Sequence, residues 1–83
     1  MSSYRFAVAV MPRDGILDPQ GRAVETALPH LGIEGVSAIR VGRRVELSVE
    51  AADQPAARAV VERLATELLA NPLIESWAIE VLP

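Results

Sequence analysis

Apolar residues recur at every second position in two parts of this chain, and that spacing predicts β-strands. Residues 44–51 show the cleanest alternation, with apolar side chains at 45, 47 and 49 and polar or charged ones between them. In residues 4–11, Phe6, Val8 and Val10 alternate with Ala7, Ala9 and Met11. Two further apolar segments, residues 36–41 and 73–82, are also expected to be strands.

Helical spacing of apolar residues predicts a first helix after the loop at residues 12–17. Asp18 is the expected N-cap. Pro19 suits the first helical position, because an N–H at that position has no partner within the helix and its absence from proline costs nothing. Gly32 fits the left-handed conformation that ends many helices. Pro29 removes one helical hydrogen bond, so we expect it to kink or shorten the helix.

A second helix is predicted after Asp53, which is its expected N-cap, with Pro55 in the first turn. Its expected apolar stripe consists of Ala57, Val60, Val61, Leu64 and Leu68. The Asn71–Pro72 pair should end the helix, because proline disfavours a helical conformation in the residue before it.

The element order is therefore β-α-β-β-α-β within a single domain, residues 1–83. With right-handed crossovers this order predicts an α+β, ferredoxin-like sandwich, in which an antiparallel four-stranded sheet carries both helices on one face. The first and third strands should be central in such a sheet.

The face of the sheet that the helices leave open must meet either water or another protein. We expect it to present small and apolar residues, namely Ala7, Ala9, Met11 and Ala78. An apolar central patch on so small a domain is typical of a contact surface. Self-association through this face is our hypothesis; a solvated face is the alternative.

Composition restricts the function further. The eight basic residues are all arginine, and the eleven acidic residues give a formal net charge of −3. Proteins that bind nucleic acid need a surplus of cations to neutralise phosphates, so that class is disfavoured. The chain has no cysteine, and its one histidine is His30, so we expect neither a disulfide nor a metal site. A core this small favours stabilisation by oligomerisation.

No arrangement of residues points to catalysis by this chain. His30 has no nucleophile nearby, and no glycine-rich loop followed by Lys-Ser or Lys-Thr is present to hold a phosphate. Arg40, Arg43 and Arg44 form a cluster that could bind a phosphate or a carboxylate, or could simply keep a turn soluble. An acylphosphatase-like hydrolase would need Arg13 in its loop and an asparagine on a central strand, but the only asparagine, Asn71, follows the second helix.

Two segments are more distinctive: Gly15-Ile16-Leu17-Asp18-Pro19-Gln20-Gly21 and Leu68-Leu69-Ala70-Asn71-Pro72-Leu73-Ile74-Glu75, with Arg40-Val41-Gly42-Arg43 between them. In this order, on so short a chain, they resemble the PurS family, the small subunit of phosphoribosylformylglycinamidine synthase. The resemblance covers essentially the whole chain. A regulatory domain of the ACT type, which has the same element order and binds small molecules, is the alternative interpretation.

The resemblance implies a non-catalytic subunit that joins a glutaminase subunit, PurQ, to an ATP-dependent synthetase subunit, PurL, so that ammonia passes between them. It also implies self-association as a dimer or tetramer. ATP and Mg²⁺ would be used by the complex, with no cofactor bound by this chain, and the expected location is the cytoplasm. The residues expected to contact partners, or else to serve only the fold, are Gly15, Asp18, Pro19, Gln20, Gly21, Arg40, Arg43, Asn71 and Pro72.

Overall fold

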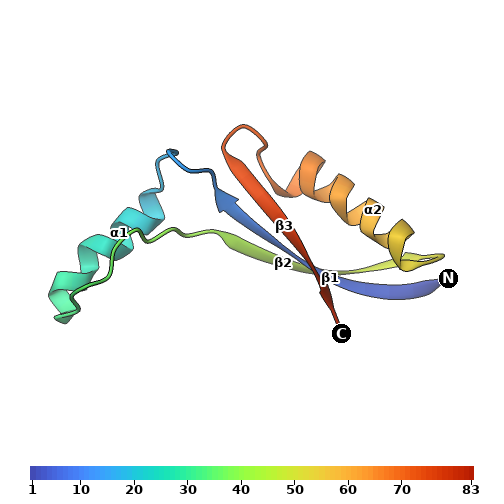
Figure 1. Ribbon diagram of the computed structural model, residues 1–83, viewed down its shortest axis with the longest axis horizontal. Helices are drawn as coiled ribbons and strands as arrows, with labels where there is room; N and C mark the ends of the chain where they lie inside the picture. The colour runs from blue at the N-terminus through green and yellow to red at the C-terminus, as the bar shows by residue number, and fades with distance from the viewer.

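The computed structural model describes residues 1–83 and consists of three strands and two helices (Figure 1). The strands are β1 (Ser2–Pro12), β2 (Arg43–Ala51) and β3 (Glu75–Leu82). The helices are α1 (Pro19–Ala27) and α2 (Gln54–Leu64). A 3₁₀ turn, Leu28–Leu31, follows α1, and a π-helical turn, Ala65–Leu69, follows α2.

β1 is the central strand and pairs antiparallel with β2 on one side and β3 on the other. The predicted α+β class and antiparallel sheet are confirmed. The sheet has three strands rather than four, because residues 36–41 do not form one, and β2 is consequently an edge strand instead of a central one.

Residues 36–42 run beside α1 without regular secondary structure instead of joining the sheet. Gly35 and Ala38 have positive φ angles of 81° and 57°, which interrupt a regular strand. The N–H groups of Ile39 and Val41, which a neighbouring strand would have bonded, donate to the carboxylates of Glu25 and Asp18. The prediction of a strand here was wrong because the pattern of apolar residues does not show where backbone donors find acceptors.

The helix ends follow the sequence closely. Asp18 and Asp53 are the N-caps, and their carboxylates accept hydrogen bonds from the N–H groups of Gly21 and Ala56. The α-helical part of the first helix ends just before Pro29, and Gly32 closes the 3₁₀ turn with φ 71°. The expected shortening at Pro29 and the glycine stop are both confirmed.

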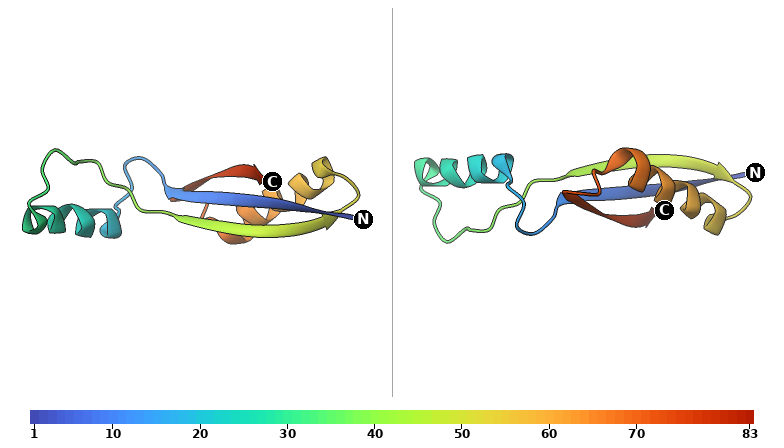
Figure 2. Two further views of the ribbon diagram at one scale, coloured as in Figure 1. Left: turned by 90° about the horizontal axis from the view of Figure 1, so that it is seen from below. Right: turned by 90° about the horizontal axis from the view of Figure 1, so that it is seen from above.

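The core lies between one face of the sheet and α2 (Figures 1 and 2). Phe6, Val8 and Val10 are fully buried there against the small side chains of α2 and the following turn, Ala57, Val61 and Ala65. The expected stripe was partly wrong, since Val60 and Leu68 are 45% and 75% exposed. The π-helical turn adds a residue per turn and so brings Leu69, rather than Leu68, against the core.

α1 does not cover the sheet. Both views in Figure 2 place it beyond the end of the strands, at the opposite end of the molecule from the N-terminus. The molecule measures 52 × 28 × 14 Å and has a radius of gyration of 16.5 Å, whereas a compact domain of this length has one of roughly 12 Å. The prediction that both helices lie on one face therefore holds for α2 and was wrong for α1.

Candidate functional site

The three segments that the sequence singled out meet at one end of the sheet. β1 ends there and β2 and β3 begin there, since Val10 pairs with Arg43 and Pro12 pairs with Glu75. We call residues 13–21, 39–43 and 69–75, which surround this end, the motif junction. All nine residues expected to contact partners belong to it.

Asp18 connects two of these segments. One carboxylate oxygen accepts the N–H of Gly21 at 2.9 Å, and the other accepts the N–H of Val41 at 2.8 Å. These two bonds, helped by the charge of Arg40, hold the pKa of Asp18 below its ordinary value. Glu25, which lies further along α1, accepts the N–H of Ile39 at 2.8 Å. Two carboxylates thus fix residues 39–41 along α1.

Gly21 is the residue that allows this close approach. It is buried in the first turn of α1, and a Cβ at this position would collide with the carbonyl oxygen of Ile39. Gly42 is constrained in the same way by the backbone of Val10. Pro19 and Gln20, by contrast, are exposed on the first turn of α1. Asp18 and Gly21 therefore have structural roles, while Pro19 and Gln20 present their side chains to solvent.

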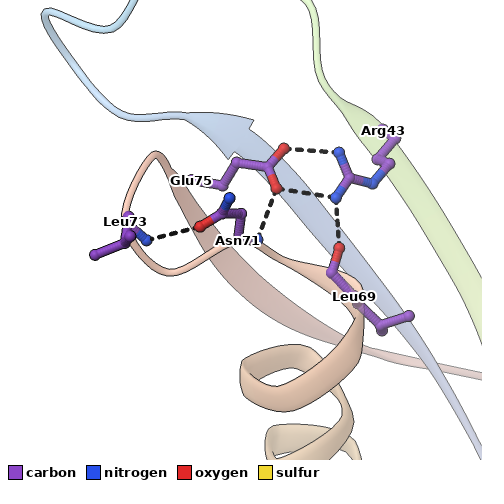
Figure 3. Close-up of polar contacts among 5 residues, drawn as sticks. All are labelled: Arg43, Leu69, Asn71, Leu73 and Glu75. Atoms are coloured by element: carbon purple, nitrogen blue, oxygen red, sulfur yellow. Dashed lines mark hydrogen bonds and ion pairs between the residues drawn. The ribbon is translucent and has the colours of Figure 1, made fainter.

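Arg43 and Glu75 form a two-point ion pair that closes the loop between α2 and β3 (Figure 3). The distances are 2.7 Å from Nη1 to Oε2 and 3.0 Å from Nη2 to Oε1. Arg43 also donates to the carbonyl oxygen of Leu69, and Glu75 accepts the N–H of Asn71 at 2.8 Å. The Arg43 guanidinium, with the Asn71 N–H, lowers the pKa of Glu75. Arg43 is thus occupied within the chain.

Asn71 orders the same loop from within, because its side-chain oxygen accepts the N–H of Leu73 at 3.1 Å. Figure 3 shows this bond next to the ion pair. The backbone carbonyl of Asn71 accepts the N–H groups of Ile74 and Glu75 as well. The loop is a compact turn that Asn71 stabilises locally, and contact of Asn71 with a partner stays a prediction.

Arg13 is a functional candidate that the sequence analysis did not select for partner contact. Its N–H donates to the carbonyl of Ile74 at 2.8 Å, and its Nε donates to the carbonyl of Pro72 at 3.1 Å. It thereby joins the loop that precedes the first distinctive segment to the second segment. The two residues of the side-chain bond are 59 positions apart, so no local sequence signal could have revealed it.

A hollow of 310 Å³ lies between the β1–α1 loop and residues 38–40. Gly15, Asp18 and Arg40 all line it, together with Arg13 and Arg22. Arg40 forms an ion pair with Asp14 at 3.3 Å, and the Asp14 side chain is fully exposed. Arg40 and Arg43 therefore have different surroundings: Arg40 borders an open hollow, and Arg43 lies in a closed loop.

On the open face of the sheet, the small residues do lie together. Ala9 pairs with Ala78, and Met11 pairs with Ser76. Charged side chains surround them: Arg44, on β2, pairs with Glu46 at 3.1 Å and reaches across β1 to Glu80 at 3.0 Å. Ala7 is only 1% exposed, whereas Ala9 is exposed. This face is more polar than its alanines alone suggested, and its role in self-association stays a prediction.

The structure does not assemble the hydrolase site that was considered as an alternative. Asn71 lies in the α2–β3 loop and not on the central strand, and the Nε of Arg13 is bonded to Pro72. His30 is exposed in the turn after α1. No three His, Asp or Glu side chains come together as metal ligands would. None of the helices is both long and apolar enough to span a bilayer.

The chain matches one family model over residues 5–83, described as PurS: Phosphoribosylformylglycinamidine (FGAM) synthase. A PurS subunit of that synthase from Mycobacterium leprae is 44% identical over 75 residues, which are 90% of this chain and 91% of the relative. The PurS subunit from Synechocystis is 39% identical over 79 residues, 95% of this chain and 79% of the relative. The solved PurLQS structure from Thermotoga maritima contains a chain that superposes with a TM-score of 0.90 at 32% identity, covering 99% of this chain and 100% of that one.

Proposed function

The chain belongs to the PurS family of phosphoribosylformylglycinamidine synthase subunits, and we propose that it is the non-catalytic assembly subunit of that complex. In the proposed role it joins the glutaminase subunit to the synthetase subunit and supports the passage of ammonia between them. The complex as a whole converts formylglycinamide ribonucleotide, ATP and glutamine into the amidine.

One observation carries this proposal. The chain superposes over nearly its full length, at a TM-score of 0.90, on a chain of the Thermotoga maritima PurLQS structure. PurLQS denotes the L, Q and S subunits together, so the matched protein is a partner of both other subunits. Because this chain has the same family and the same fold as the matched subunit, we infer that it occupies the same position in an equivalent complex.

The proposal assigns the chemistry to the partners. PurQ would release ammonia from glutamine, and PurL would activate the substrate with ATP and Mg²⁺. The chain offers no glycine-rich loop followed by Lys-Ser or Lys-Thr that would suit ATP. We place the complex in the cytoplasm. The regulatory and hydrolase interpretations are set aside, because family membership accounts for the whole chain.

Self-association as a dimer or tetramer is part of the proposal. α1 and the residues after it form an arm that does not pack on the sheet, and its apolar side chains are exposed. Leu31 is 71% exposed, Val36 50%, and Val24 and Ile33 43% each. Apolar surface of this extent on a small, elongated chain favours coverage by another protein surface.

The test is reconstitution from purified subunits. The chain alone should neither hydrolyse ATP nor deaminate glutamine. Added to the synthetase and glutaminase subunits, it should restore glutamine-dependent formation of the amidine, while activity with ammonium salts in place of glutamine should depend on it much less. Equal glutamine-dependent activity with and without the chain would refute the assembly role.

A further inference from the structure

The hollow beside the β1–α1 loop has an unusual distribution of charge for an acidic chain. Six of the eight arginines form ion pairs with a carboxylate: Arg5, Arg40, Arg43, Arg44, Arg58 and Arg63. The two that form none are Arg13 and Arg22, and both line this hollow. Unpaired guanidinium groups are thus concentrated at one place.

Arg40, the third arginine of the hollow, is only weakly paired. Its partner Asp14 is 3.3 Å away, and the Asp14 side chain is 100% exposed. Exposed ion pairs contribute little to stability, so an incoming anion could displace Asp14 at small cost. The other carboxylate at the hollow, Asp18, already accepts N–H groups from Gly21 and Val41. Three arginines therefore line the hollow together with one carboxylate, that of Asp14, which an exposed ion pair alone holds.

The side chain of Arg13 and the backbone around Arg40 are also held in place. The Nε of Arg13 is bonded to the carbonyl of Pro72, which leaves its two terminal nitrogens to donate elsewhere. Arg22 lies on the first turns of α1, and Arg40 lies on the segment that Asp18 and Glu25 fasten to that helix. An anchored guanidinium and a fixed backbone lower the entropy that is lost when a carboxylate binds at the hollow.

Apolar side chains border the same hollow. Leu17 is 68% exposed and Ile16 is 38% exposed. A free inorganic anion would leave both in water, whereas a protein segment with an apolar residue beside its carboxylate would cover them. The combination of a cationic hollow and an apolar border therefore fits a peptide segment better than a small anion.

We propose that this hollow is the docking site for a carboxylate-bearing surface segment of another subunit of the synthase. An aspartate or glutamate of that subunit displaces Asp14 and bonds Arg40 and Arg22, and a neighbouring apolar side chain packs on Leu17. This inference rests on the proposed assembly function and specifies which surface of the chain performs it.

The test compares two double variants with the same change of charge. Arg22→Glu with Arg40→Glu reverses the charge of the hollow, and Arg58→Glu with Arg63→Glu does the same on α2, away from it. The milder Arg22→Gln with Arg40→Gln serves if charge reversal perturbs folding, which circular dichroism will show. Binding of each variant to the purified synthetase subunit and to the glutaminase subunit is measured by titration calorimetry at low and moderate salt.

The hollow variant should raise the Kd for one partner by at least about tenfold and lose most of its salt dependence, while the α2 variant binds as the wild type does. At limiting concentration the hollow variant should restore less glutamine-dependent activity than the wild type does. An excess of the hollow variant should restore the wild-type level. Unchanged binding, or equal weakening by the α2 variant, would overturn the proposal. A fall in the solution mass of the isolated hollow variant would also overturn it, since the site would then bind a second copy. Failure of the wild type to restore activity would instead count against the assembly function.

Discussion

The guanidinium of Arg43, at the start of β2, forms two contacts of 2.7 Å and 3.0 Å with the carboxylate of Glu75, at the start of β3. The two residues begin the two edge strands of the sheet, on opposite sides of β1. The pair also binds the carbonyl of Leu69 and the N–H of Asn71. It therefore ties the end of the helical segment to the start of the last strand.

Replacement of Arg43 should destabilise this loop. In Arg43→Ala the carboxylate of Glu75, whose side chain is only 16% exposed, keeps a single donor, and the carbonyl of Leu69 loses its side-chain partner. We expect Tm at fixed protein concentration to fall by about 4–8 °C, the shift typical of one lost interaction network in a domain of this size. Arg63→Ala, which breaks an exposed pair with Glu67, is the control and should change Tm far less.

Stability should depend on pH through Asp18 and Glu75. Hydrogen bonds from Gly21 and Val41 lower the pKa of Asp18, and Arg43 with Asn71 lowers the pKa of Glu75. Their stabilising contributions are complete above the unfolded-state values of about 3.9 and about 4.3, and are lost as the pH falls through the lower folded-state values. Tm should fall below about pH 4.5. Glu75→Gln should have a lower Tm at neutral pH and a smaller decrease in acid; an identical pH profile would contradict this assignment.

Gly21→Ala should destabilise the protein although alanine is the better helix former. A Cβ at this buried position would collide with the carbonyl of Ile39, so residues 39–41 would have to move away from α1. We expect a loss of about 1–3 kcal/mol, as for other overpacked sites. Hydrogen exchange should reveal faster exchange of the Ile39 and Val41 amides. Protection equal to that of the wild type would show that the close approach is not required.

Ala9→Arg tests the open face of the sheet. Ala9 is exposed and lies opposite Arg44, so a new arginine would project from the face next to an existing positive charge. If copies of the chain meet through this face, the solution mass measured by light scattering should fall. Ala59→Arg, on the exposed side of α2, is the matched control. A mass unchanged from that of the wild type would place the contact elsewhere, with the exposed arm of α1 as the next surface to test.

Much of the candidate site could be predicted, but not the reason for each residue. The three distinctive segments meet at one end of the sheet, and Asp18 caps α1 as its place before Pro19 predicted. The second bond of Asp18, to Val41, and the pairing of Arg43 with Glu75 join residues 23 and 32 positions apart. Such contacts depend on how the chain returns to the same place, and a local pattern contains no information on that.

The sequence by itself determined the local structure: the alternation at residues 4–11 and 44–51 set the faces of β1 and β2, and Asp, Pro and Gly set the helix ends, because these effects act within a few residues. Only the tertiary structure decided that residues 36–42 stay outside the sheet, that α1 extends beyond it, and that Arg13, Arg22 and Arg40 share one hollow. The physical reason is competition for backbone donors and apolar surface. The carboxylates of Asp18 and Glu25 accept N–H groups that a strand would have donated to the sheet. Which acceptor these N–H groups find depends on segments distant in the sequence, so it is fixed only by the tertiary structure.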